Sequence, residues 1–272
     1  MYKILALDID GTLLNSKKEI TPVVEKAITS LQDRGIPVLI VSGRPAQGIR
    51  HVAEAIHFKE RGGYILSFNG GKIIDCRTGE TVYSKPIDSL YYKEIIEYAN
   101  TLNASILTYD GDDIITEKPD NKYVDIESKV VRMPVRKVDN LYEAISKDNV
   151  VVDKFLIAGE PEYMMSKVSA MAEHFKGRLN VFMSEPFFIE VVPLGIDKAA
   201  SLEVLLSRLG MTRAELVACG DGRNDVTMIE YAGMGVAMGN ACEEVKAVSD
   251  YITASCDEDG VAVAIEKFFP HM

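Results

Sequence analysis

Apolar positions follow two spacings in the first quarter of the chain, and these spacings predict alternating strands and helices. Residues 4–7, 37–41 and 64–68 form nearly continuous apolar runs, the pattern of strands that are covered on both faces in a parallel sheet. Residues 21–34 instead place apolar side chains every three or four positions, as a helix with one buried face does. A second helix is expected over 45–56. Strand, helix and strand in this order predict right-handed parallel crossovers.

The sequence changes character after Pro86, which predicts a second module. Segments 72–75 and 81–83 have the pattern of a short hairpin that closes one edge of the first sheet. Beyond residue 86, strands and helices recur at hairpin-like spacing, which favours an α+β insertion. Its expected elements are helix 88–102, strand 104–109, irregular polar sequence over 110–149, strand 154–157, helix 161–175 and strand 180–183.

The parallel pattern is expected to resume with strand 189–192. The elements predicted after it are helix 197–209, strand 216–219, helix 224–231, strand 234–237 and a final helix near 259–268. We therefore predict an α/β protein with a Rossmann-like parallel-sheet core formed by residues 1–85 and 189–272. Residues 86–188 are predicted to form an inserted α+β cap domain.

Composition narrows the possible partners. The formal net charge of the 272 residues is −11, which argues against nucleic acid as a partner because such binding depends on Lys and Arg neutralising phosphates. The apolar segments are short and interrupted by charge, so no membrane contact is expected. A strand begins at once after Met1, leaving no room for a signal peptide, and a cytoplasmic location is expected. The four widely spaced cysteines are expected to be reduced thiols.

Two carboxylates stand directly behind the first apolar run. Asp8 and Asp10 lie two residues apart at the end of the predicted strand, followed by Gly11. Two carboxylates at a strand end repel each other and need a cation or a shared proton, and glycine lets the backbone bend close to a ligand. Mg²⁺ together with a phosphate would satisfy this segment, although a simple Asp-Gly turn explains the same residues.

Further polar residues follow other predicted core strands. Ser42 and Gly43 end the second strand, where a hydroxyl and exposed amides can bind an oxyanion; helix capping is the alternative. Lys198 begins a helix capped by Asp197, opposing the helix dipole, which favours a ligand-facing role over a solvated surface position. Carboxyl ends of parallel strands meet at one edge of a sheet, so these side chains are expected to lie together.

A second acidic segment follows the strand predicted over 216–219. Residues 220–225 contain Asp221, Asn224 and Asp225 with two glycines. Such an oxygen-rich set suits Mg²⁺, which keeps several waters and takes few protein carboxylates; plain helix capping is the alternative. Asn69-Gly70 after the third strand has the pattern of a hairpin turn, and this simpler explanation is at least as good as a ligand-binding one.

In chain order, residues 8–12, residues 42–44, Lys198 and residues 220–225 resemble the four motifs of the haloacid dehalogenase (HAD) superfamily. Residues 10–14, the large insertion between the second and third motifs, and Asn69-Gly70 are similar to its Cof-type sugar phosphatase branch, so the resemblance spans essentially the whole chain. It implies a cap of the C2 type over the core. Two departures are Ala199, where the branch often has glycine, and Arg223, where an acidic or neutral residue is frequent.

The resemblance also implies an activity and roles. It implies an Mg²⁺-dependent phosphatase that hydrolyses small phosphate monoesters through an aspartyl-phosphate. Asp8 would be the nucleophile and Asp10 the acid that protonates the leaving group and then activates water. The implied metal ligands are Asp8, Asp10 through its main-chain carbonyl, Asp221 and Asp225, the last either directly or through another ligand. The implied phosphate-binding groups are Ser42, Gly43, Lys198 and Asn224.

Other functions share parts of this residue set. A phosphomutase of the same superfamily would use the same acids but transfer phosphate between positions of one sugar. A noncatalytic sugar-phosphate sensor needs no complete set of reacting groups, and a phosphoacceptor receiver would be shorter and would not need the second acid. The expected partner is a small phosphorylated metabolite, bound by a monomer or a small homo-oligomer.

Overall fold

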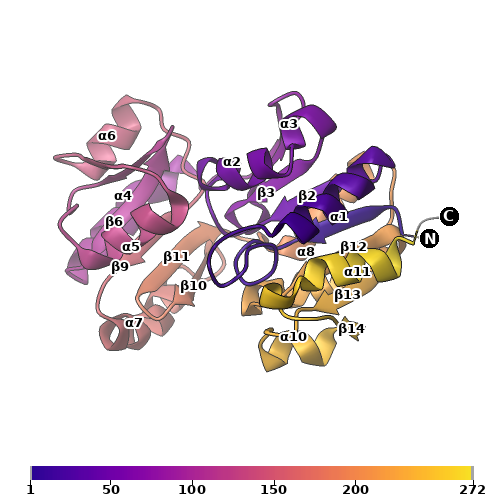
Figure 1. Ribbon diagram of the computed structural model, residues 1–272. Helices are drawn as coiled ribbons and strands as arrows, with labels where there is room; N and C mark the ends of the chain where they lie inside the picture. The colour runs from indigo at the N-terminus through magenta and orange to yellow at the C-terminus, as the bar shows by residue number, and fades with distance from the viewer. Residues whose placement is uncertain (1, 271–272) are drawn as a thin grey trace. The chain divides into compact units, whose positions relative to one another are not determined.

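The computed structural model describes residues 2–270, which form two compact units (Figure 1). The first unit combines the chain up to Tyr83 with the chain from Asp197 onward, and the second consists of Ser84–Ile196. The core is therefore discontinuous in sequence, as expected, with the second unit inserted into it. None of the helices within residues 2–270 is long and apolar enough to cross a membrane.

An eight-stranded sheet forms the centre of the first unit. Its strands lie in the order β14-β13-β12-β1-β2-β3-β4-β5, and the six from β14 to β3 run parallel. All four residues of β1 are fully buried, as the continuous apolar run predicted. The strands are β1 (Ile4–Leu7), β2 (Val38–Val41), β3 (Tyr64–Ser67), β4 (Lys72–Asp75), β5 (Thr81–Ser84), β12 (Leu216–Gly220), β13 (Met234–Ala237) and β14 (Tyr251–Ile252).

Strand β1 lies at the point where the strand order reverses. Its neighbours are β2, the next strand in sequence, and β12, which comes from beyond the insertion. Ligands of open parallel sheets bind beside such a reversal, at the carboxyl ends of the strands. The predicted site residues that follow β1, β2 and β12 in sequence lie at this place, whereas Lys198 opens α8 after the inserted unit.

The helices of the first unit follow the predicted pattern closely. In α1, Pro22 occupies the first turn, the Thr21 hydroxyl accepts a hydrogen bond from the Val24 amide, and Ile28 and Leu31 are buried. Figure 1 shows α1 beside α11. The helices are α1 (Pro22–Asp33), α2 (Ala46–Ala55), α3 (Phe58–Arg61), α8 (Lys198–Arg208), α9 (Val226–Tyr231), α10 (Glu243–Val248) and α11 (Gly260–Phe268).

The second unit has its own sheet and its own apolar core. Six strands lie in the order β10-β11-β9-β6-β7-β8, and helix residues such as Ile95 and Met171 pack with strand residues such as Phe155. The strands are β6 (Ser105–Asp110), β7 (Asp113–Thr116), β8 (Val135–Lys137), β9 (Phe155–Ala158), β10 (Leu179–Glu185) and β11 (Phe188–Pro193); the helices are α4 (Tyr92–Thr101), α5 (Lys122–Val131), α6 (Leu141–Lys147) and α7 (Pro161–His174).

The boundary predicted between residues 188 and 189 is wrong. Strand β11, expected at the start of the second core segment, pairs antiparallel with β9 and β10 in the inserted unit. Its residues Ile189 and Val191 belong to the apolar core of that unit. A short apolar run is equally suited to either sheet, so its residues alone could not decide between them. The observed boundaries are Tyr83/Ser84 and Ile196/Asp197.

The segment 110–149, predicted to be irregular, contains two helices and two strands. Asn121 and Asn140 cap the starts of α5 and α6, and their side-chain oxygens accept hydrogen bonds from the amides of Tyr123 and Glu143 at 2.9 Å each. Each helix is short and buries few residues, among them Val124 in α5. The exposed faces of these two helices carry mostly polar residues, and only a narrow apolar stripe of each is buried. The helical spacing of the apolar residues was therefore too weak to be recognised in the sequence.

A tight turn between β3 and β4 fixes the position of the start of α8. The hairpin predicted from Asn69-Gly70 is present, with β3 and β4 antiparallel and Asn69 at a φ of 54°. Gly70 has a φ of +100°, and a Cβ atom built on it would lie 2.3 Å from the Ser201 side chain and 3.0 Å from the Asp197 carbonyl. Only glycine fits between the turn and the first turn of α8.

Replacing Gly70 by alanine is expected to destabilise the protein by about 2 kcal/mol or more, because it adds both a strained φ and an overlap with α8. The free energy of unfolding in urea measures this effect. Gly79→Ala is the matched control, since Gly79 has a φ of +77° and a Cβ atom added to it would have nothing within 4 Å. It should lose only the strain contribution, and equal losses in both variants would show that the contact with α8 has no energetic role.

Candidate active site

The structure brings three adjacent strand ends and one helix start together. Asp8 directly follows β1, Ser42 follows β2, Asp221 follows β12, and Lys198 opens α8. Lys198 Nζ lies 2.9 Å from the Val41 carbonyl at the end of β2 and 2.6 Å from Asp8 Oδ1. These four predicted site residues therefore belong to one site.

Lys198 is the buried centre of this site. The residue is 1% exposed, which excludes the solvated surface position that the sequence left open. Besides Asp8, the ammonium group contacts Asp225 Oδ1 at 2.6 Å. Asp197 caps α8 by accepting a hydrogen bond from the Ala200 amide at 2.9 Å, as expected. A cation at the start of a helix is disfavoured by the helix dipole. The negative charges of Asp8 and Asp225 compensate for this unfavourable interaction of Lys198.

Asp225 connects Lys198 to the loop after β12. The Asp225 side chain is fully buried, and its Oδ2 accepts hydrogen bonds from the amides of Asp221 at 3.0 Å and Gly222 at 2.9 Å. Both of its oxygens are thus engaged, one by the ammonium group and one by two amides. Asp225 therefore fixes the loop and Lys198 together and has little capacity left for another ligand.

Asp221 is positioned by the loop that follows β1. The Thr12 hydroxyl donates a hydrogen bond to Asp221 Oδ1 at 2.8 Å. A Cβ atom on Gly11, whose φ is +79°, would lie 2.3 Å from Asp221 Oδ2, so the carboxylate rests against the glycine backbone. The group that approaches Gly11 closely in the structure is therefore the side chain of Asp221, and the approach of a ligand to this glycine stays a prediction.

Burial and neighbouring charges shift the pKa values of Asp8, Asp221 and Lys198. Burial, together with the charge of Asp225, raises the pKa of Asp8 to about 8, although Lys198 opposes the shift. Burial also raises the pKa of Asp221 to about 6. Burial would lower the pKa of Lys198, but Asp225 and Asp8 outweigh it and raise that pKa. One ammonium thus compensates only part of the negative charge that three ionised carboxylates would bring.

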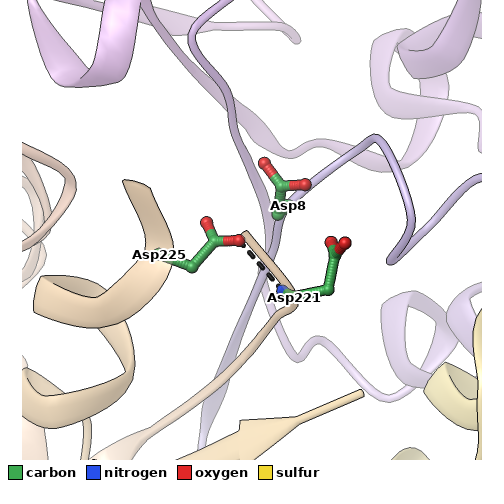
Figure 2. A group of neighbouring side chains, drawn as sticks. All are labelled: Asp8, Asp221 and Asp225. Carbon is green, nitrogen blue, oxygen red and sulfur yellow. Dashed lines mark hydrogen bonds between the residues drawn. The ribbon is translucent and has the colours of Figure 1, made fainter. Parts of the chain in front are cut away.

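This arrangement fits a divalent cation. One oxygen each from Asp8, Asp221 and Asp225 lies within 4.8 Å of the others, and Figure 2 shows the three carboxylates gathered around the ends of β1 and β12. A hard cation binds such oxygen sets, and its charge would return Asp8 to its ionised form at neutral pH. Among residues 2–270, the carboxylate of Asp10 does not belong to this group of three acids.

Asp10 lies in a different environment from Asp8. Arg44 donates two hydrogen bonds to its carboxylate, from Nε to Oδ2 at 2.9 Å and from Nη2 to Oδ1 at 2.7 Å. Lys18 Nζ donates a third to Oδ1 at 2.8 Å. Burial would raise the pKa of Asp10, but the two cations outweigh it and lower that pKa. The structure thus separates two acids that are only two residues apart in sequence.

The remaining predicted phosphate-binding groups, Ser42, Gly43 and Asn224, lie in the loops after β2 and β12. The Ser42 side chain is buried, and its hydroxyl accepts a hydrogen bond from the Arg44 amide at 3.2 Å. A Cβ atom added to Gly43 would lie 3.2 Å from the Asn69 side chain, whose Oδ1 is 3.4 Å from Asn224 Nδ2. Asn69 therefore joins the loops after β2, β3 and β12.

Four residues of this site had no assigned chemical role in the sequence prediction. Thr12, Lys18 and Arg44 are the direct partners of Asp221 and Asp10, and Asn69 was explained as turn sequence alone. Arg44 lay within the second motif, so its position next to Ser42 and Gly43 was a usable signal. Lys18 and Asn69 offered no such signal, because their positions depend on how separate loops fold together.

Comparison with known proteins identifies the family. The family model for haloacid dehalogenase-like hydrolases matches residues 5–265. The 5-amino-6-(5-phospho-D-ribitylamino)uracil phosphatase YcsE of Bacillus subtilis is 30% identical over 269 residues, covering 98% of this chain and 95% of that protein. A haloacid dehalogenase-like hydrolase from Bacteroides thetaiotaomicron is 45% identical, with a TM-score of 0.94 and coverage of 99% and 100% of the two chains.

A third comparison concerns the branch within the family. The structure of the HAD subclass IIB sugar phosphatase BT4131 matches with a TM-score of 0.79 at 25% identity, covering 98% of this chain and 99% of that one. The chain belongs to the haloacid dehalogenase-like hydrolase family, and it is a phosphatase of that family. The resemblance to the Cof-type branch and the α/β fold class are both confirmed.

Replacing Asp225 by alanine is expected to destabilise the protein by about 3 kcal/mol, because it leaves the buried Lys198 with one carboxylate fewer and two loop amides without an acceptor. Urea unfolding measures the loss. Asn224→Ala is the control from the next position, since Asn224 is exposed and its one described hydrogen bond is 3.4 Å long. A loss no larger in Asp225→Ala than in Asn224→Ala would contradict the role given to the buried pair.

Proposed function

We propose that this phosphatase is Mg²⁺-dependent and hydrolyses small phosphate monoesters through an aspartyl-phosphate formed on Asp8. The observation that supports this most strongly is the bridge from Asp8 through Lys198 to Asp225, with the Asp221 carboxylate beside it. It combines a nucleophilic carboxylate, a fixed positive charge and an oxygen-rich cation site at the carboxyl edge of one sheet.

Mg²⁺ would be held by Asp8, the main-chain carbonyl of Asp10 and Asp221. Both oxygens of Asp225 already accept hydrogen bonds, so we assign it to the support of Lys198 and of the loop that carries Asp221. When bound, the ion would offset the negative charge shared by the nucleophile and the phosphate. Mg²⁺ takes few protein carboxylates and keeps several waters, which matches this small donor set.

Asp8 is the proposed nucleophile. Its Oδ1 is bound to Lys198, which fixes the carboxylate at the end of β1. Attack by an Asp8 oxygen on phosphorus forms the acyl phosphate, the bond from phosphorus to the ester oxygen breaks, and the leaving alkoxide takes a proton from Asp10. Water then attacks phosphorus, Asp10 accepts its proton, and inorganic phosphate leaves while the Asp8 carboxylate is restored.

Arg44 gives Asp10 a defined orientation for both proton transfers. The two parallel hydrogen bonds from one guanidinium fix the plane of the carboxylate as well as its position. Arg44 and Lys18 lower the pKa of Asp10 in the absence of substrate. A phosphate dianion brought nearby opposes this effect, because added negative charge favours the protonated acid. Asp10 would thus gain its proton as substrate binds.

The phosphate oxygens would be stabilised by Lys198, the Ser42 hydroxyl, the Gly43 amide and Asn224. Phosphoryl transfer depends on positioning and on charge stabilisation more than on covalent chemistry. Lys198 and Ser42 are buried and therefore already ordered before substrate binds. Ala199 and Arg223, the two departures from the branch pattern, remove none of these groups.

The substrate class rests on the relatives. YcsE is a phosphatase of a phosphoribitylamino-uracil, and BT4131 is a sugar phosphatase. We therefore propose sugar phosphates or similar phosphorylated metabolites as substrates of this chain. The net charge of −11 supports a small anion over a polyanion, because only local cations such as Lys198 and Arg44 can compensate its charge.

A phosphate-release screen over hexose, pentose and triose phosphates, flavin mononucleotide and pyridoxal phosphate tests the proposed activity. Release is expected with Mg²⁺ and should stop in excess EDTA. Asp8→Asn should lower kcat by roughly 10³-fold or more, because it removes the reacting group. Retained activity in this variant would show that Asp8 is not the nucleophile. Conversion of a sugar phosphate to its isomer without phosphate release would instead identify a phosphomutase.

Asp10→Ala is expected to slow hydrolysis of alkyl phosphates far more than that of p-nitrophenyl phosphate. An alkoxide leaving group needs a proton in the transition state, whereas nitrophenolate does not. The measurement is kcat for both substrates in wild type and variant, with Arg213→Ala, an exposed position outside the site, as the control. Equal losses on the two substrates would rule out Asp10 as the proton donor.

A further inference from the structure

We propose that a cavity at the amino-terminal edge of β2 and β3 is a second binding site, for a small anion with carboxylate or phosphate groups. The cavity has a volume of about 350 Å³ and is lined by Gly35–Pro37 before β2, Gly62–Tyr64 at the start of β3, Gln32, Arg61, Asp75 and Arg77. All of these residues belong to the first unit. The active site lies at the opposite, carboxyl edge of the same sheet.

The position of the cavity separates it from the catalytic chemistry. Strands β2 and β3 each have four residues, so their two edges lie about 10 Å apart along the strand direction. None of the residues that line the cavity contacts Asp8, Asp10 or Lys198 within the described hydrogen bonds and ion pairs of residues 2–270. A ligand there would leave the catalytic groups untouched.

Gln32 supplies a buried acceptor to this cavity. Its Nε2 donates hydrogen bonds to the carbonyls of Ile56 at 3.0 Å and Gly62 at 3.4 Å, which fixes the orientation of the amide. Its Oε1 is buried, and no residue in the described range 2–270 donates to it. A buried acceptor without a donor is unfavourable. An O–H group of a bound ligand, or of a water ordered by that ligand, would satisfy it.

Arg77 supplies the positive charge. Its Nη2 donates to the Arg61 carbonyl at 2.7 Å, and a Cβ atom on Gly62 would lie 2.9 Å from the same nitrogen. The guanidinium is therefore held against a glycine backbone that leaves room for it. Within residues 2–270, no carboxylate lies at ion-pairing distance from Arg77, whereas Arg61 is paired with Asp33. The planar donors of arginine match carboxylate and phosphate oxygens.

The combination specifies the ligand chemistry. A guanidinium without an ion-pair partner favours an anion, and the unsatisfied amide oxygen favours a hydroxyl donor on the same molecule. Asp75 also lines the cavity but forms no ion pair with Arg77 among the described residues; its Oδ1 instead accepts hydrogen bonds from the backbone amides of Arg77 at 2.9 Å and Thr78 at 3.3 Å. Small hydroxy acids, and phosphates that carry a protonated oxygen, have both an anionic group and a hydroxyl donor. Molecules of either class are smaller than the cavity.

Amide NMR of the full chain in the presence of Mg²⁺ tests this proposal, with L-malate and inorganic phosphate as separate probes. Each probe that binds should shift the amides of Gly62 and Gly63, whereas occupation of the active site should shift Gly43. A response to malate identifies carboxylate as the recognised group, and a response to phosphate identifies phosphate; a response to either supports the site. Arg77→Ala should weaken the response at least about tenfold, because it removes charge-assisted hydrogen bonds.

Arg213→Ala is the matched control for charge, since Arg213 is an exposed arginine that does not line the cavity. Arg77→Lys keeps the charge without the planar donors and should bind with intermediate affinity. Arg77 is exposed, and thermal unfolding verifies that each variant is folded. The proposal is overturned if neither probe shifts Gly62 and Gly63, or if Arg77→Ala responds as wild type does.

Discussion

The structure of the site depends on one buried ammonium group held between two carboxylates. Lys198 contacts Asp8 from β1 and Asp225 from the loop after β12, and it also reaches the carbonyl at the end of β2. Removing one partner of such a buried set leaves a charge without compensation, which is far more costly than the pair is favourable. The chain on both sides of the inserted unit must therefore fold together before any of these charges is tolerable. Gly70 helps to position Lys198, because it lets the turn after β3 approach the start of α8 closely.

Charge that remains uncompensated makes the site suited to its proposed chemistry. Lys198 contacts two of the three clustered acids, and burial raises the pKa of Asp8 to about 8 and that of Asp221 to about 6. A divalent cation bound by Asp8 and Asp221 would offset their negative charges, and Asp8 would then stay ionised as a nucleophile. Asp10, only two residues away, is instead held by Arg44 and Lys18. Two chemically identical side chains thus lie in different environments, one beside Lys198 and one beside Arg44 and Lys18, which suits the separate roles proposed for them.

Local signals in the sequence were sufficient for most of the core and for the centre of the site. Strand ends followed by acids predicted that Asp8 and Asp221 would meet, and Asp197 followed by a lysine predicted the start of α8 with Lys198. The assignment of β11 to the inserted sheet could not be predicted in this way, because an apolar run fits either sheet and only its pairing with β9 decides. The roles of Lys18 and Asn69 were similarly hidden, since their partners are set by loops that meet only in the folded protein. Arg44 was visible in the second motif, but its partner Asp10 was not predictable from spacing alone.

Anomalous diffraction from crystals grown with Mn²⁺ in place of Mg²⁺ tests the central claim most directly, because it locates the ion without relying on activity. One peak is expected about 2.1 Å from a carboxylate oxygen of Asp8 and one of Asp221, with Lys198 still bridging Asp8 and Asp225. The same crystals of Asp221→Asn should show a weaker peak or none. An ion bound elsewhere in the chain, or full occupancy without any contact to Asp8, would contradict the account.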